Sequence, residues 1–202
     1  MFVDRSAIFI DGAYFDKLLE QEFNRARVDF SALATALAHG DNVLRTYYYH
    51  CPPYVSQPPT EEELRRFEAK ERFFLALNSL PRFQVRLGRL LYRGTDGQGR
   101  PIFVQKLVDI MLGVDLVRMA ATRQITKAIL VAGDSDFVPA VDEAKRLGVL
   151  MSLWHGPVQG ILHGSSVHRE LWNACDERAE ITQALVTSVQ RSYNNGANTS
   201  VP

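Results

Sequence analysis

The feature that most constrains this chain is a short apolar run that ends in two carboxylates. Ile129–Ala132 is apolar with a β-branched bias, which predicts a strand buried on both faces. Gly133 breaks the run, and Asp134, Ser135 and Asp136 follow it, before a segment with helical spacing. Two acids therefore stand where a buried strand passes into a helix. In an open α/β sheet this is the edge at which ligands bind.

These acids have two interpretations, and the residues alone leave both open. As helix caps, Asp134 or Ser135 would accept hydrogen bonds from the first turn, and Asp136 would favour the positive end of the helix dipole. As ligands, two carboxylates that repel each other would be neutralised by a cation. Oxygen ligands suit a hard cation such as Mg²⁺ or Mn²⁺.

The same pattern occurs near the start of the chain. Ser6–Ile10 is a short apolar run followed by Asp11 and a small residue, and helical spacing continues over Tyr14–Phe23. Asp11 alone is explained equally well as a cap. Adjacent parallel strands, however, would bring Asp11 and Asp134 to one edge of the sheet.

A third source of acids is the segment that starts at Lys106, which has helical spacing and is apolar almost all round. Asp109 and Asp115 lie among its apolar residues, and a buried carboxylate is costly without a partner. An ion pair between Lys106 and Asp109 is the simplest structural interpretation, and it leaves Asp115 unexplained. Arg118, three residues further on, is the structural alternative for Asp115.

Positive charge is concentrated in one segment, residues 82–106, which has five arginines and one lysine against one acid. Apolar and polar residues alternate over 82–87, which predicts a strand with an arginine face. Gly94–Gly99 is typical of a hairpin turn, and Arg100–Gln105 is the expected partner strand. Arginines interleaved with aromatic residues suit a phosphate backbone and base stacking, whereas a plain solvated ribbon is the alternative.

Composition limits the class of protein. The 202 residues are 46% hydrophobic, and 23 basic residues balance 23 acidic ones, so any attraction to a polyanion must be local. Cys51 and Cys175 lie far apart, which disfavours a disulfide framework or a zinc ribbon, and His50 beside Cys51 has no second such pair nearby. No signal peptide or membrane span is indicated, so we expect a cytoplasmic protein without a membrane partner.

The expected domain organisation is one α/β domain over residues 1–175. A helix is predicted over Ser165–Trp172, and a last one over Glu177–Gln190 within the extension 176–191. The polar tail 192–202 is expected to be disordered. The residues do not indicate whether the chain self-associates or has protein partners.

The order of these features resembles that of the NYN domains of the PIN-like nuclease superfamily, in particular their LabA-like branch. The resemblance covers most of the segment from Ser6 to Trp154. Its most specific parts are Lys106-Leu107-Val108-Asp109 and Gly133-Asp134-Ser135-Asp136-Phe137. One position departs from the family, which often has Asn three residues after the first Asp, where this chain has Tyr14.

The resemblance implies a Rossmann-like, mostly parallel sheet flanked by helices, with an inserted basic β-hairpin, and an enzyme that cuts RNA with Mg²⁺ or Mn²⁺. The implied catalytic residues are Asp11, Asp109, Asp115, Asp134 and Asp136. The implied metal ligands are Asp11, Asp109, Asp134 and Asp136. The expected RNA contacts are Lys106, Arg86, Arg89, Arg93 and Ser135.

Two other functions are compatible with parts of the sequence. A phosphatase of the haloacid dehalogenase type also has an acid at a strand end, but it needs Asp-x-Asp after the first strand. Here that segment reads Asp11-Gly12-Ala13, which disfavours this class. The second alternative is an RNA-binding or regulatory protein on the same fold with a weak or degenerate site, for which Tyr14 is the argument.

Overall fold

The first strand shows how both faces of the sheet are covered. In the computed structural model, which describes residues 4–157 and 167–191, Ala7 and Phe9 face one hydrophobic cluster, while Ile8 and Ile10 face a second one. All four side chains are fully buried. A strand that buries both faces lies in the interior of an α/β sheet.

The described elements occur in the order β1 (Ser6–Asp11), α1 (Gly12–Glu22), α2 (Phe30–Ala38), β2 (Val43–His50), α3 (Glu61–Asn78), β3 (Phe83–Leu87), β4 (Arg89–Thr95), β5 (Pro101–Lys106), α4 (Val108–Ala121), β6 (Lys127–Val131), the 3₁₀ turn η1 (Ser135–Phe137), α5 (Val138–Arg146), β7 (Leu150–His155), α6 (Arg169–Ala174), β8 (Glu177–Glu180) and α7 (Gln183–Ser188). One sheet has the strand order β3-β2-β1-β6-β7-β8, with every pairing parallel. The strands β4 and β5 form a separate antiparallel hairpin.

The strand order of the sheet switches between the neighbouring strands β1 and β6. From β1 it passes outward to β2 and β3, and then it returns to β6 and continues through β7 to β8 on the other side. Ile10 and Val131 are register partners in the two central strands. Such a switch point leaves a crevice at the carboxyl ends of the strands, where ligands bind in open α/β sheets.

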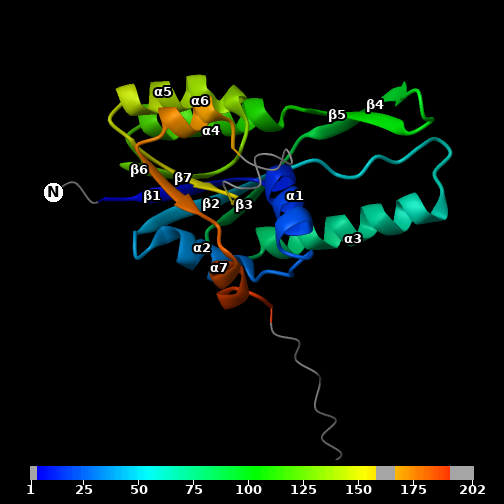
Figure 1. Cartoon of the computed structure of the whole chain (residues 1–202), viewed down its shortest axis with the longest axis horizontal. Helices are drawn as coiled ribbons and strands as arrows, with labels where there is room; N and C mark the ends of the chain where they lie inside the picture. The colour runs from blue at the N-terminus through cyan, green and yellow to red at the C-terminus, as the bar shows by residue number, and fades with distance from the viewer. Residues whose placement is uncertain (1–3, 158–166, 192–202) are drawn as a thin grey trace, which may run out of the picture.

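Helices cover both faces of the sheet. The helices α4, α5 and α6 contribute to the first hydrophobic cluster, and α1, α2, α3 and α7 to the second, on the opposite face (Figure 1). The hairpin extends from the α4 side of the sheet. This architecture confirms the predicted α/β class with a mostly parallel sheet and a hairpin.

The basic segment does not form one ribbon, which corrects part of the prediction. Its first strand, β3, joins the main sheet beside β2, and only β4 and β5 form the hairpin. Gly88 separates them, and a Cβ at this position would lie 2.3 Å from the Lys106 carbonyl oxygen. Arg86 is therefore a residue of the main sheet and not of the hairpin.

The C-terminal region also differs from the prediction. A helix was expected over Glu177–Gln190, but Glu177–Glu180 is a strand that pairs with β7, and only Gln183–Ser188 is helical. The strand is short and lies at the sheet edge, and its sequence lacks the apolar alternation that predicts strands. The helix expected from Ser165 begins at Arg169, and 165–166 and the tail 192–202 lie outside the described residues.

No helix in the described part of the chain combines the length and apolar character needed to cross a membrane.

Candidate active site

Asp11 is the last residue of β1 and also caps the helix that follows. Its Oδ1 accepts hydrogen bonds from the backbone amides of Ala13 (3.0 Å) and Tyr14 (3.2 Å). The pKa of this half-buried carboxyl is raised to about 6, first by burial and then by the charge of Asp109. Both interpretations of Asp11 thus hold together, because Oδ1 caps the helix while the carboxylate also faces another acid.

Three further acids lie near this point. Asp134 follows β6, and its Oδ1 accepts a hydrogen bond from the Asp136 amide at 3.1 Å, so it also caps the short turn η1. Asp109 lies in the first turn of α4. The pKa of Asp109 is raised by desolvation and then by the charges of Asp134 and Asp136. Asp11, Asp109, Asp134 and Asp136 therefore form a connected set of carboxylates, which we call the acid cluster.

The acid cluster suits a hard cation by its chemistry. Carboxylate oxygens are the ligands that Mg²⁺ and Mn²⁺ prefer, and the like charges that raise the pKa of Asp11 and Asp109 indicate a place that a cation would stabilise. In residues 4–157 and 167–191, no three carboxylate, imidazole or thiolate groups are arranged to hold a metal ion. Asp109, Asp134 and Asp136 are exposed, so metal binding would require these side chains to change their arrangement.

Asp115 is not part of the acid cluster, which corrects the expectation that it joins the other acids. It is buried, with 3% of its surface exposed, and both of its oxygens are bound by Arg86, at 2.9 Å from Nε and 2.7 Å from Nη2. The Tyr49 hydroxyl donates to it at 3.1 Å, and Arg118 Nη2 lies at 3.3 Å. Its charge is thus neutralised within the fold.

The same contact corrects the role expected for Arg86. Its guanidinium forms a bidentate pair with Asp115, and this geometry is the strongest that an arginine and a carboxylate adopt. Arg86 is therefore held against α4 and is not available as a mobile phosphate contact. Two other cations of the basic segment are similarly engaged, because Arg100 pairs with Asp96 and Arg82 donates to the Val43 carbonyl oxygen.

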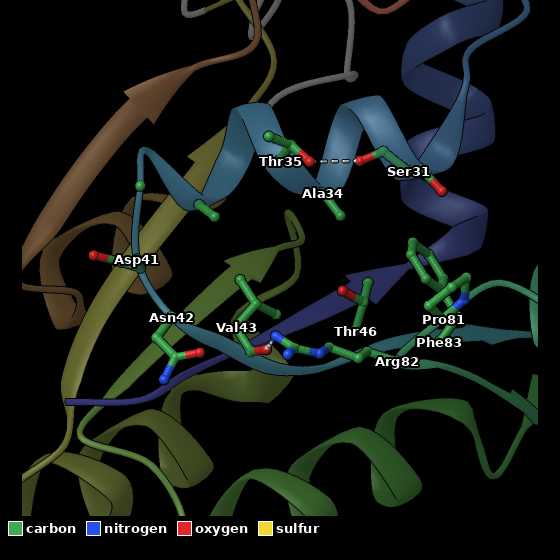
Figure 2. Close-up of a pocket in the computed structure, with 12 residues that line it drawn as sticks. Ser31, Ala34, Thr35, Asp41, Asn42, Val43, Thr46, Pro81, Arg82 and Phe83 are labelled. Carbon is green, nitrogen blue, oxygen red and sulfur yellow. Dashed lines mark hydrogen bonds between the residues drawn. The ribbon is translucent and has the colours of Figure 1, made fainter. Parts of the chain in front are cut away.

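Arg82 also lies far from the acids in the fold. It precedes β3 and lines a pocket of about 390 Å³ at the amino ends of β2 and β3 (Figure 2). The acid cluster lies at the opposite, carboxyl ends of the strands. Figure 2 shows the Arg82 side chain directed to the backbone of Val43, so this pocket contributes no charge to the acids.

Four cations of the basic segment have no acidic partner among the residues described. Arg82 lies far from the acids, and the other three are Arg89, Arg93 and Lys106. Arg89 and Lys106 are direct cross-strand partners in the hairpin. Like charges in this position destabilise a β-ladder unless an anion lies between them. Lys106 lies two residues before the helix that carries Asp109, so it is the cation of this segment nearest to the acids along the chain, and Arg89 lies opposite it in the hairpin.

We expect the double substitution Arg89→Ala and Lys106→Ala to weaken RNA binding and to lower the slope of log affinity against log salt by about 1.4, or about 0.7 for each lost single-strand phosphate contact. Fluorescence anisotropy over a salt series measures both quantities. The matched control is Arg66→Ala with Arg72→Ala, which removes two positive charges from α3. Equal effects of the two pairs would place the RNA elsewhere.

Tyr14 stands at the position where the family that this sequence resembles often has Asn. It follows β1 and contacts the segments that follow β6 and β7. Its hydroxyl accepts a hydrogen bond from the Gly156 amide beyond β7, at 2.9 Å. Its ring lies over Gly133, where a Cβ would be only 2.5 Å from the ring. Burial raises the pKa of the Tyr14 hydroxyl to about 12, so it remains protonated. Tyr14 therefore supports the loop that carries Asp134 instead of leaving space beside it.

Sequence reasoning did not find a second charged group beside Asp11. Asp16 accepts hydrogen bonds from Lys70 Nζ (2.6 Å) and the Tyr48 hydroxyl (3.2 Å), and its Oδ2 lies 3.0 Å from His50 Nε2. Burial opposes ionisation of Asp16, but the contacts with His50 and Lys70 outweigh it and lower its pKa. These residues come from α1, α3 and β2, and no motif in the sequence connects them.

The acid cluster opens on one side into a groove between α4 and α5. The groove has a volume of about 1100 Å³. Asp109, Asp136, Ser135 and Lys106 line the end next to the acids. Ser135, an expected RNA contact, therefore lies on this surface. Arg89 and Arg93 are not among the residues that line it.

Comparison with known proteins gives a family match and one structure of similar fold. The family model described as NYN domain matches residues 5–181. No curated protein matches the chain. The crystal structure of a protein of unknown function from Vibrio parahaemolyticus is similar, with 18% sequence identity and a TM-score of 0.56, covering 89% of this chain and 93% of that chain. At this identity the likeness shows a common fold alone.

Proposed function

Because the chain belongs to the NYN domain family, we propose that it is a divalent-metal-dependent ribonuclease, which hydrolyses phosphodiester bonds of RNA at the acid cluster. The observation that supports this function best is the convergence of four carboxylates at the switch point of the sheet, where two of them have raised pKa values. The LabA-like branch remains the subgroup that the motifs favour.

Each side chain has a role that follows from its position. Asp11, Asp109, Asp134 and Asp136 would hold Mg²⁺ or Mn²⁺. Such an ion, when bound, makes a water nucleophilic near neutral pH and stabilises the leaving oxygen. The amides of Ala13 and Tyr14 would keep the Asp11 carboxylate in a fixed position at this site.

Two cations complete the arrangement. Lys106 and Arg89 would bind phosphates of the strand that approaches along the hairpin, because neither has an acidic partner in the described part of the chain. They would thus oppose the repulsion between RNA phosphates and the carboxylates.

The direct test uses purified protein with a labelled single-stranded RNA, with EDTA, Mg²⁺ or Mn²⁺ added in turn. We expect cleavage that requires the metal, and Mn²⁺ binding measurable by calorimetry. Binding of RNA without cleavage under any of these conditions would instead support the regulatory alternative, for which Tyr14 and the open arrangement of the acids are the arguments. Absence of both RNA and metal binding would refute both functions.

Metal binding is expected to depend on pH through Asp11. Its carboxyl has a pKa of about 6 in the fold, above its ordinary value of 3.8, so the proton competes with the metal below pH 6. Mn²⁺ affinity should therefore rise as pH increases through 6. Without metal, the unfolded chain binds fewer protons than the fold between about pH 4 and 6, so stability should fall as pH rises through this window.

Calorimetry at pH 5, 6, 7 and 8, with melting curves over the same range in EDTA, measures both trends. Asp11→Asn is the control, because an asparagine oxygen can still cap α1 but does not titrate. Mn²⁺ affinity that is flat between pH 5 and 7 in the wild type would show that Asp11 is not a ligand.

A further inference from the structure

The groove between α4 and α5 is walled by exposed aliphatic side chains. On α4, Ile110 and Val114 are 66% and 58% exposed, and Leu107 just before the helix is 41% exposed. Pro139 and Ala140 form the α5 side. Exposed aliphatic groups in adjacent helical turns form a continuous surface that has no partner among the described residues, and such a surface on a monomer indicates a binding site.

Gly113 allows the two helices to approach closely at the floor of this groove. A Cβ at Gly113 would lie 3.4 Å from the Ala140 Cβ, at the limit of ordinary contact. The groove volume of about 1100 Å³ exceeds the roughly 300 to 1000 Å³ of sites that hold one small molecule. It is therefore large enough for more than one nucleoside.

The two ends of the groove are polar, and its middle is not. Asp109 and Asp136 line one end together with Lys106, and Glu170 is a third acid of the lining. Arg118, which also contacts Asp115, lies nearer the other end. Asp109 and Arg118 are nine residues apart on α4, or roughly 14 Å along the helix axis. The groove thus begins at the acid cluster, continues over an apolar surface, and passes a second cation.

We propose that this groove binds the unpaired nucleosides next to the scissile phosphate, with bases against Ile110 and Val114 and a phosphate near Lys106. The proposal rests on the proposed nuclease function, because the groove is continuous with two of its acids. The apolar middle offers base faces a surface but no hydrogen-bonding side chains to read base edges. Recognition here is therefore indifferent to base identity and excludes paired bases, whose faces are stacked within a duplex.

A protein partner fits these observations less well than RNA. A second copy seated on the exposed face of α4 would cover Asp109 and Asp136, which would close the acid cluster to its substrate. Lys106 has no acidic partner in the described residues and supplies the charge that a phosphate needs at the acidic end. The position of the groove, which is continuous with the acid cluster, therefore favours a nucleic acid strand.

The test compares two double variants by fluorescence anisotropy with a labelled single-stranded RNA in EDTA, so that no cleavage is needed. Ile110→Ala with Val114→Ala removes the groove wall. Leu64→Ala with Leu75→Ala, at side chains 41% and 65% exposed on α3, removes comparable exposed aliphatic surface elsewhere. We expect the groove variant to bind about tenfold more weakly, because apolar area buried against the bases is lost, and the control to bind like the wild type.

A second oligonucleotide, with abasic sites in place of its bases, identifies the contact. The wild type and the groove variant should bind it equally. Unchanged affinity of the groove variant for the normal RNA, or an equal loss with the abasic RNA, would overturn the proposal. So would a wild-type dimer in sedimentation that the groove variant dissociates, since the occupant would then be a second copy.

The experiments test the proposed nuclease function and the proposed nucleoside-binding groove separately. A groove that binds RNA in EDTA while no metal supports cleavage would refute the nuclease and leave the subsite standing. Metal-dependent cleavage with equal rates and affinities in the two double variants would refute the subsite and leave the nuclease. A wild type that binds no RNA would overturn both.

Discussion

Asp134→Asn is expected to fold like the wild type, to lose Mn²⁺ binding, and to cleave single-stranded RNA at least ~100-fold more slowly, the scale on which losing one stabiliser of developing charge acts. Asp134 is exposed, so its substitution removes no core packing. An asparagine oxygen can replace Oδ1 as acceptor of the Asp136 amide and preserve the turn η1. The change therefore removes one negative charge from the acid cluster and little else.

Calorimetry with Mn²⁺ and a gel assay on a labelled oligonucleotide measure the two losses on the same preparations. Asp142→Asn, an acid on α5 that is not part of the acid cluster, is the control for loss of one charge. Cleavage that survives in Asp134→Asn would point to a contaminating nuclease. A mutant that retains full Mn²⁺ affinity would remove Asp134 from the ligand set.

Asp115→Asn is expected to have the opposite result, with a loss of stability of about 3 kcal/mol and unchanged affinity for Mn²⁺. Removing one partner of a buried ion pair costs about 3 to 5 kcal/mol, and the lower end applies because Arg86 is 34% exposed at its side chain. For a chain of this size the melting temperature should fall by roughly 6 to 12 °C. Denaturant unfolding measures the loss of stability, and calorimetry measures the affinity for Mn²⁺.

The double substitution Arg86→Met with Asp115→Leu separates the charge from the packing. Replacing both members of a buried pair by apolar side chains is often neutral, so the double variant should be more stable than Asp115→Asn alone. A stability of Asp115→Asn equal to that of the wild type, together with lost Mn²⁺ binding, would return Asp115 to the acid cluster.

The strand ends were predictable because their signals are local. The acids at 11 and 134 each follow a short buried run and precede a helix, and both facts can be read within about ten residues. The capping box of α3, in which Thr60 and Glu63 exchange hydrogen bonds, is equally local. The parallel order that unites Asp11 with Asp134 follows from the alternation of strands and helices.

The pairing of Arg86 with Asp115 was not predictable in the same way. These residues are 29 positions apart, and they meet only because β3 joins the sheet beside β2 and so faces α4. Sequence alone placed Arg86 in the hairpin, since the alternation on either side of Gly88 looks continuous. The glycine is required by the Lys106 carbonyl oxygen, and that contact exists only in the folded chain.

The groove and the charged group around Asp16 escaped prediction for a related reason. Each is built from elements distant in sequence, and their residues are individually ordinary. The segment of α4 is apolar almost all round in sequence, whereas one face of the helix is open and exposes its aliphatic side chains. Periodicity shows that a helix has apolar faces, but not how many of them other elements cover.

The double role of Asp11 gives the four carboxylates unequal freedom. One oxygen of Asp11 is held by two amides of a helix, so this group cannot follow an incoming ion without uncapping α1. The other three acids are exposed. One oxygen of Asp134 is held by a single amide of the turn η1, whereas Asp109 and Asp136 lie in the first turn of a helix and in η1, where their side chains can rotate. As the proposed ligands, these acids would combine a stationary member with adjustable ones, and they would select ions by charge and by preference for oxygen more than by size.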